Sequence, residues 1–241
     1  MVDRIFSEPK LAELYDAWCA GRPDFAFYLP LVMSAQRVLD VGCGTGELLR
    51  LAREGGHSGR LCGLDPADAM LQVARRRPDI DWVLGDLLSV PWDTEFDLIV
   101  MTGHAFQVFL EDDELRMSLA AVRSALTEQG RFIFETRNPL ARVWETWTGP
   151  PMEVVHDRTT VLIGGEVRPF DGKFLSFSSI FNSPSWDAPE VSHSTLRFLD
   201  PDSLSSFLTG AGLAIEEQFG TWDRQPLSDT NPEIITIARR A

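Results

Sequence analysis

The sequence predicts an α/β protein whose parallel sheet is covered by helices on both faces. Short apolar runs alternate with amphipathic helical patterns up to Glu135, which is the order of βαβ units. The first run ends in three alternating glycines, VLDVGCGTG, a turn suited to close approach of a ligand at a helix N-terminus. The 241 residues, 44% of them hydrophobic, are enough for one domain (1–241) that carries an insertion.

The expected strands are short apolar runs, each bounded by Gly, Pro or Asp. They cover residues 37–41, 60–65, 80–85, 96–101 and 131–135. Helical periodicity fills the gaps between them, at 47–54, 67–77 and 111–126. Because the runs are apolar at successive positions, we expect a sheet that is buried on both faces.

After Glu135 the pattern changes to longer extended runs. Three are expected, at roughly 152–168, 174–181 and 190–198, with Asp171-Gly172 as a hairpin signal. They predict an antiparallel β insertion over residues 138–198. The regular pattern then resumes, with a helix opened by Asp200-Pro201-Asp202 and strands near 213–219 and 233–238.

Composition and charge exclude several classes of function. The 22 basic and 36 acidic residues give a net charge of −14, which repels a nucleic-acid backbone. The N-terminus lacks the apolar core of a signal peptide and no apolar run is long enough to span a membrane, so we expect a cytoplasmic protein without a membrane partner. Cys19, Cys43 and Cys62 are odd in number and lack metal-ligand spacing, which predicts reduced thiols, no disulfide and no metal site.

The glycine spacing and the acid ahead of it indicate the charge of the ligand. Gly42, Gly44 and Gly46 are spaced more tightly than the Gly-x-Gly-x-x-Gly of dinucleotide sites. Asp40 would repel a pyrophosphate, whereas it suits an ammonium or a sulfonium. Asp65 follows the second strand, where a carboxylate can bind ribose hydroxyls, although it could instead cap the next helix.

A third acid, Asp86, follows the third strand. It could accept from an adenine amino group while the N–H of Leu87 donates to the ring, or it could cap a turn. Three acids at three successive strand ends favour a shared ligand site over three unrelated caps.

Five segments in this order resemble the successive motifs of class I S-adenosylmethionine-dependent methyltransferases of the small-molecule type. They are VLDVGCGTGELLRLA, LCGLDPADAMLQVA, VLGDLLSVPW, FDLIVMTGHAFQVF and LTEQGRFIFETRNP. The resemblance is close over residues 36 to 137 and looser over the final helix and strands. It implies a Rossmann-like, doubly wound seven-stranded sheet in the order 3-2-1-4-5-7-6 with the last strand antiparallel.

The resemblance also implies S-adenosyl-L-methionine as the cofactor and a place for each motif residue around it. Asp40, Gly42, Cys43, Gly44 and Gly46 would surround the methionine moiety, Asp65 with Pro66 the ribose, Asp86 with Leu87 the adenine, and Thr102, Gly103 and His104 the amino group and sulfonium. Residues 1–35 resemble the helical N-terminal cap of this family. On that analogy Tyr15 would approach the sulfonium and Arg22 the carboxylate, although Tyr15 could equally be a core residue and Arg22 a solvated one.

Methyl transfer is an in-line displacement, so a general base is optional. His104 is the best candidate, because imidazole titrates near neutral pH and this loop would lie over the donor; a purely hydrogen-bonding role is the alternative. His57 is expected to be solvated, and His156 and His193 lie in the insertion with no assigned role. The acid run at residues 111–114 suits a first helical turn better than a metal.

In this family a β insertion at 138–198 commonly forms a lid over the acceptor or a dimer contact. Its aromatic side chains suit a partly apolar small molecule, and the loop TGHAF lacks the pattern of nucleobase-amine methyltransferases. We therefore expect methyl transfer to N or O of a small molecule by a monomer or a homodimer. The alternatives are an NAD-dependent oxidoreductase, a donor-binding protein without turnover, and a methyltransferase of proteins.

Overall fold

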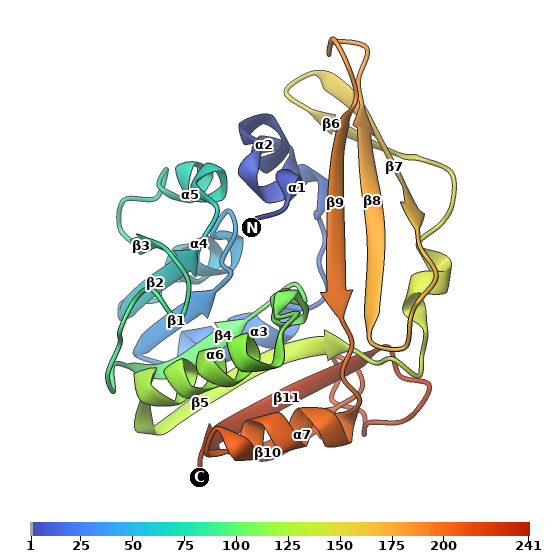
Figure 1. Cartoon of the computed structure of the whole chain (residues 1–241). Helices are drawn as coiled ribbons and strands as arrows, with labels where there is room; N and C mark the ends of the chain where they lie inside the picture. The colour runs from blue at the N-terminus through green and yellow to red at the C-terminus, as the bar shows by residue number, and fades with distance from the viewer. Residues whose placement is uncertain (1) are drawn as a thin grey trace.

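Seven strands form the central sheet of this protein (Figure 1). The structure, a computed structural model, describes residues 2–241. The strands are β1 (Arg37–Val41), β2 (Arg60–Asp65), β3 (Asp81–Leu84), β4 (Phe96–Met101), β5 (Leu126–Arg137), β10 (Leu213–Phe219) and β11 (Glu233–Arg240). Their order across the sheet is β10-β11-β5-β4-β1-β2-β3, with β11 antiparallel to both neighbours. This confirms the predicted seven-stranded order with an antiparallel last strand.

Helices cover both faces of this sheet, and the alternation of side chains along each strand decides which face is which. The helices are α1 (Arg4–Ser7), α2 (Pro9–Trp18), α3 (Phe25–Ser34), α4 (Glu47–Glu54), α5 (Asp68–Ala74), α6 (Asp112–Ala125) and α7 (Pro201–Gly210). On β1, Leu39 packs with α6 and α7, whereas Val38 packs with α3 and α4. In Figure 1, α6 and α7 lie in front of the sheet and α3 lies behind it.

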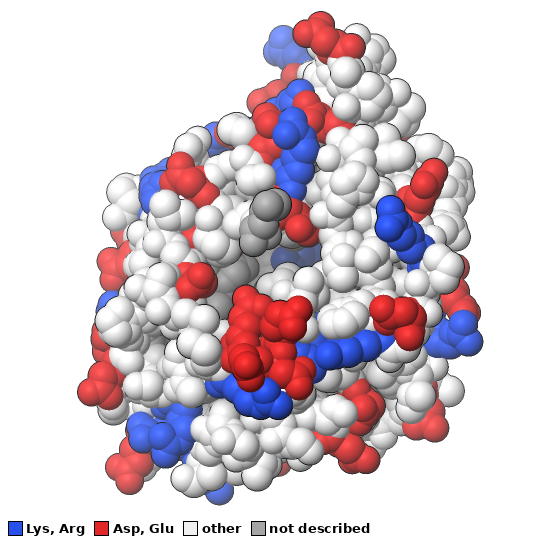
Figure 2. Space-filling view, in the orientation of Figure 1, with Lys and Arg blue, Asp and Glu red and all other residues white. Residues whose placement is uncertain are grey.

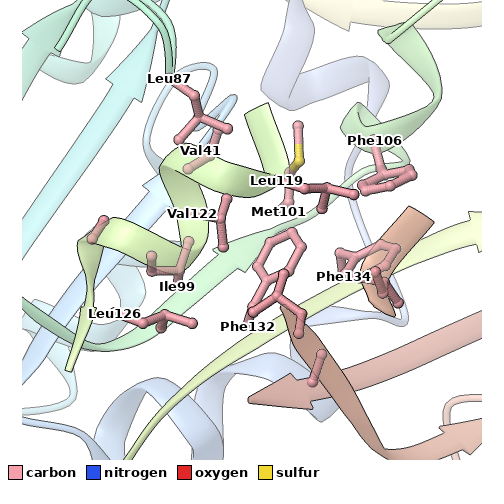
Figure 3. Packing of buried hydrophobic residues seen from close by; sticks show 14 of the residues in the cluster. Val41, Leu87, Ile99, Met101, Phe106, Leu119, Val122, Leu126, Phe132 and Phe134 are labelled. Atoms are coloured by element: carbon pink, nitrogen blue, oxygen red, sulfur yellow. The ribbon is translucent and has the colours of Figure 1, made fainter. Parts of the chain in front are cut away.

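Aromatic rings fill the layer between the sheet and α6 (Figure 3). Phe132 and Phe134 of β5 have ring centroids 4.6 Å apart, and Phe134 stacks on Phe106 at 4.3 Å. Leu119 and Val122 of α6 face these rings and are each 1% exposed. This core fixes β4 and β5 against each other, and with them the loops that leave their carboxyl ends.

A second sheet of four antiparallel strands occupies residues 152–197, where the antiparallel insertion is predicted. The strands are β6 (Met152–His156), β7 (Thr159–Val167), β8 (Phe174–Asn182) and β9 (Glu190–Arg197), in the order β6-β7-β8-β9. The expected number of extended runs was wrong, because the first run divides at Asp157 and Arg158. Both residues have positive φ, 47° and 65°, and they reverse the chain between β6 and β7.

The N-terminal helices pack against one face of the second sheet. Leu11 and Leu14 of α2 share an apolar cluster with Ile163 and Phe181. At the polar margin of this contact, Glu190 of β9 pairs with the N-terminal helices. Its partners are Arg4 and Lys10, each 2.6 Å away. In Figure 1 the two segments rise together above the carboxyl ends of β1, β4 and β5.

Two helix and strand boundaries differ from the sequence prediction. The helix expected over 67–77 ends at Ala74, because Pro78 has no N–H to donate to the carbonyl of Ala74 and its ring would clash with that carbonyl in a continued helix. The strand expected over 131–135 extends to Leu126–Arg137, since Leu126 already pairs with Phe96 of β4. Among residues 2–241, no helix is both long enough and apolar enough to cross a membrane.

The packing of α6 on the sheet gives a stability prediction. Leu119→Ala removes a side chain that is 1% exposed and leaves a cavity beside Phe132, so we expect a loss of roughly 2–5 kcal/mol in the free energy of unfolding, measured by urea denaturation. Leu140→Ala removes the same atoms at a position that is 58% exposed, and should change stability by less than about 0.5 kcal/mol. Equal losses in the two variants would contradict this account of the core.

Candidate functional site

The glycine turn after β1 has the backbone geometry that its sequence predicts. Gly42, Gly44 and Gly46 all have positive φ, at 70°, 57° and 77°. At Gly46 an added Cβ would lie 2.2 Å from the Trp82 ring, so a side chain is excluded there. At Gly44 nothing lies within 4 Å of the added Cβ, so this part of the turn borders open space. The turn therefore presents bare backbone at the carboxyl edge of the sheet, at the start of α4.

Asp40 lies on β1, just before this turn. Its carboxylate is buried, and hydrogen bonds do not satisfy both of its oxygens. It is 1% exposed, and its Oδ1 atom has no hydrogen-bond partner among the described residues. Burial raises its pKa to about 7, opposed by the nearby positive charge of Arg22. A cationic group bound beside Asp40 would relieve this cost.

Asp65 closes the turn from the end of β2. Its Oδ2 accepts from the N–H of Gly44 at 2.8 Å, and its Oδ1 accepts from the N–H of Ala67 at 2.8 Å. The predicted capping role is therefore present, alongside a direct contact with the glycine turn. Burial raises the pKa of Asp65, and these two N–H groups oppose that rise. Pro66, the next residue, is exposed.

The two residues expected at the adenine, Asp86 and Leu87, follow β3. The side chain of Asp86 is exposed, and its Oδ1 accepts from the N–H groups of Leu88 and Ser89, at 3.0 and 2.8 Å, so it caps its own turn. Leu87 is 5% exposed and belongs to the core that includes α6. Cys43 is half-buried, and burial raises the pKa of its thiol, so we expect it to stay uncharged.

The N-terminal cap brings Arg22 to the same edge. Its guanidinium pairs with Asp24 through two hydrogen bonds and lies 4.5 Å from the Phe25 ring centroid. Its terminal nitrogens lie 3.1 and 3.3 Å from the position that a Cβ on Gly103 would occupy. Tyr15 of α2 lies close to Arg22, and burial raises the pKa of its phenol. The structure thus brings Arg22 to the loop after β4, whereas the ring of Tyr15 packs edge-on against Phe6 and Trp18.

That loop is held by long-range hydrogen bonds. Thr102 is buried, Gly103 has a φ of 68°, and His104 has a φ of 62°, a conformation that is uncommon for residues other than glycine. The backbone N–H of His104 donates to Glu135 at 2.7 Å, and its ring Nε2 lies 2.8 Å from an oxygen of Glu233. These contacts fix both the backbone and the ring of His104.

The same site contains residues that the sequence analysis did not single out. Glu135, at 0% exposure, also accepts from the hydroxyl of Tyr28. Glu233 opens β11, and Arg137 ends β5 in direct register with it. Two of these residues, Glu135 and Arg137, could have been found from the sequence, because they are charged residues at the end of the apolar strand RFIFETR. Nothing local in the sequence links Glu233 to His104.

The other histidines lie away from this edge. His57, expected to be solvated, is 5% exposed, and its Nε2 is hydrogen-bonded to the carbonyl of Ala35 at 2.8 Å; that prediction was wrong. His193 is hydrogen-bonded to Ser178 on the outward face of the second sheet, and His156 lies beside Asp157. His104 is therefore the histidine that the fold places beside the glycine turn and the cap.

The surface above this edge is hollowed between the N-terminal helices, α5 and the start of α6 (Figure 2). Acidic side chains gather on the rim where α6 begins, with Asp112, Asp113 and Glu114 in its first turn. Two of them pair with arginines: Asp112 with Arg197 at 2.6 Å, and Asp113 with Arg116 at 2.9 Å. They therefore behave as helix-terminal charges, as the sequence indicated.

The residues present fit a sulfonium donor. Asp40 offers a buried carboxylate oxygen without a partner among the described residues, Gly44 borders open space, and Arg22, paired with Asp24, brings positive charge beside Gly103. A dinucleotide would instead place its pyrophosphate near Asp40, where like charges repel. The arrangement accepts a ligand with one cationic and one anionic end.

Comparison with known proteins agrees with this geometry. Residues 38–130 match the family profile described as "Methyltransferase domain". The demethylmenaquinone methyltransferase of Thermotoga maritima is 27% identical over 190 residues, which cover 78% of this chain and 74% of that protein.

Solved structures share the fold over nearly the whole chain. An S-adenosylmethionine-dependent methyltransferase from Clostridium acetobutylicum superposes with a TM-score of 0.75 at 17% identity, covering 96% of this chain and 98% of that one. CalS10, an amino pentose methyltransferase from Micromonospora echinaspora, superposes with a TM-score of 0.70 at 20% identity, covering 94% and 96%. The strand order, the glycine turn and the profile match over residues 38–130 thus agree on a methyltransferase domain with the fold of S-adenosylmethionine-dependent methyltransferases.

Proposed function

We propose that this enzyme transfers the methyl group of S-adenosylmethionine to N or O of a small molecule by in-line displacement. The observation that carries the donor assignment is the unpartnered, buried oxygen of Asp40 beside the open backbone of Gly44. Two structurally similar proteins, CalS10 and the sugar N-methyltransferase KedS8 from Streptoalloteichus, act on sugars, which supports a small acceptor. The net charge of −14 disfavours nucleic acid, and we expect the protein to work in the cytoplasm.

Each part of the donor has a proposed set of contacts. The methionine end lies against Asp40, Gly42, Cys43, Gly44 and Gly46, the ribose against Asp65 and Pro66, and the adenine against Asp86 and Leu87. Thr102, Gly103 and His104 face the amino group and the sulfonium, with Tyr15 and Arg22 closing from the cap. Asp86 would have to release its turn contacts in part, whereas the N–H of Leu87 can donate without rearrangement.

The donor supplies an activated methyl group, so the chain itself has to align the acceptor, exclude water and receive a proton. The N-terminal helices and the second sheet, which rise above the site, exclude water. His104 receives the proton: burial lowers the pKa of its imidazole and keeps it neutral at rest. Its Nε2–H donates to Glu233, and its Nδ1, which has no hydrogen bond within residues 2–241, is left as the free base.

Donor binding is tested first. Asp65→Ala removes a carboxylate from both the turn and the ribose, and Gly44→Val forces a β-branched residue into a φ of 57°; we expect each to weaken S-adenosylhomocysteine at least about 100-fold in isothermal titration. Asp68→Ala and Gly149→Val make the same two changes at exposed positions outside the proposed contacts. They should leave affinity unchanged. Unchanged affinity in the first pair, or binding of NAD instead, would contradict the site assignment.

Asp40→Asn tests whether the buried charge is kept for the ligand. Because the folded-state pKa of Asp40 is about 7, above its ordinary value, the folded protein holds this proton more tightly and loses stability as pH rises from about 4 to 7. At pH 8 we expect the variant to be more stable by on the order of 2–4 kcal/mol and the gain to vanish near pH 4.

The same substitution should weaken binding of the cationic donor. We expect S-adenosylmethionine to lose more affinity than S-adenosylhomocysteine, whose sulfur is neutral, when the two are titrated into Asp40→Asn at pH 8. A variant that is less stable than the wild type at pH 8, or equal losses for both ligands, would argue against a charge held for the sulfonium.

The base assignment is tested by transfer rather than by binding. His104→Ala and His104→Asn, the latter tolerant of positive φ, should keep S-adenosylhomocysteine affinity within about threefold and lower methyl transfer to a panel of small amines and alcohols by roughly 100-fold or more. His193→Ala is the matched control on the outward face. Full activity of both His104 variants would mean that the protein only aligns donor and acceptor and uses no general base. Detection of any methylated product distinguishes an enzyme from a donor-binding protein without turnover.

A further inference from the structure

Arg137, at the end of β5, is a half-buried residue whose guanidinium forms no ion pair with a described residue. Among residues 2–241, no carboxylate oxygen lies within 4.0 Å of its side-chain nitrogens. One terminal nitrogen donates to Oε1 of Gln107 at 2.9 Å, and the backbone N–H donates to the same oxygen at 3.3 Å. The other N–H groups of the guanidinium have no acceptor in the described chain.

Neighbouring residues fix the position of this side chain, but none of the described residues forms an ion pair with it. Gln107 is 1% exposed, and its amide nitrogen donates to the carbonyl of Arg197 at 3.0 Å, which directs its oxygen toward Arg137. The guanidinium also lies 4.8 Å from the ring centroid of Trp147, whose ring meets Phe177 edge-on at 5.4 Å. One edge and one face of the guanidinium are thereby fixed, and its remaining edge is free.

Arg197 shows how the same protein treats a structural arginine. Its side chain is 4% exposed and pairs with Asp112 at 2.6 Å. Arg137, by contrast, stands in register with Glu233, yet Glu233 directs its carboxylate to His104. Burial lowers the pKa of Arg137 to about 10, a cost that a paired arginine would not carry. The charges of Glu233 and Glu135 oppose this lowering, but neither carboxylate forms an ion pair with Arg137.

The free edge of Arg137 lies on the acceptor side of the site. Arg137 stands in register with Glu233, whose carboxylate is hydrogen-bonded to the ring of His104, so both side chains lie next to the same residue. Trp147 and Phe177 come from the insertion, and His104 comes from the loop over the donor. Arg137 thus connects the aromatic rings of the insertion with the surroundings of His104.

We propose that Arg137 binds an anionic group of the methyl acceptor, a carboxylate or a phosphate, and so fixes the acceptor with its nucleophile toward His104. A guanidinium edge donates two parallel N–H groups, which match the two oxygens of either anion. The proposal rests on the proposed function, because it places this anion on the acceptor and not on the donor. The acceptor's negative charge is then recognised by the one positive charge of Arg137, although the protein as a whole is acidic.

The test uses protein saturated with S-adenosylhomocysteine and four probes that share one ring: benzoate, phenyl phosphate, benzyl alcohol and benzylamine. In isothermal titration we expect one or both anions to bind at least about tenfold more tightly than benzyl alcohol and benzylamine. Preference for benzoate or for phenyl phosphate identifies which anion the site takes. Arg137→Gln should reduce anion affinity about 10- to 100-fold, and Arg137→Lys, which keeps the charge but not the paired donors, should reduce it less.

Two controls separate this proposal from the proposed function and from misfolding. Arg239→Gln removes an exposed guanidinium from β11, at the opposite end of the same sheet, and should leave anion affinity unchanged. All variants should bind S-adenosylhomocysteine with the affinity of the wild type, which shows that they are folded. A wild type that does not bind S-adenosylhomocysteine would overturn the proposed function instead. Equal affinity for neutral and anionic probes, no binding of either anion, or anion binding unaffected by Arg137→Gln would overturn the role of Arg137.

Discussion

The carboxylate of Glu135 ties together three parts of the chain that must meet for the site to exist. It lies buried at the end of β5, accepts from Tyr28 of α3 with one oxygen and from the backbone of His104 with the other. The N-terminal cap, the loop after β4 and the fifth strand are therefore joined at one group. Because a buried carboxylate is costly unless its oxygens are hydrogen-bonded, this junction has little freedom to rearrange.

Around this fixed point, the protein leaves other charges unbalanced. Asp40 lacks a partner for one oxygen, and Arg137 lacks an anion. Arg197, by contrast, forms an ion pair with Asp112, although its Nε atom has no hydrogen-bond partner among the described residues. Stability given up at a functional site is commonly recovered elsewhere in an enzyme, and here the stacked rings of Phe106, Phe132 and Phe134 contribute to the buried core.

The sequence predicted most of the fold because its signals are local. Gly42, Gly44 and Gly46 have the positive φ that their spacing implied, and β1, β2 and β4 have the predicted bounds. The turn at Asp157 and Arg158 was missed because no glycine stands there and an arginine at positive φ is unusual, although Asp157 is itself a turn-forming residue. The helix before Pro78 was predicted too long for the opposite reason, because its periodic pattern was followed past the point that the proline allows.

The site was predicted in part, and the division follows the range of the interactions. Asp40 and Asp65 could be placed from strand ends alone, although the bond from Gly44 to Asp65 could not. The partner of His104 lies 129 residues away in the chain, so only the closed sheet brings it near. Its αL backbone likewise depends on the hydrogen bond to Glu135, which no pattern in TGHAF encodes.

The packing of the second sheet on the N-terminal helices has a consequence for the order of folding. Leu11 and Leu14 leave the ribosome long before Ile163 and Phe181, the residues that cover them. The hairpins of the second sheet are local and can form quickly, but their apolar face closes only across most of the chain length. The glycine turn and its strands can thus assemble first, and the walls around the acceptor are completed last.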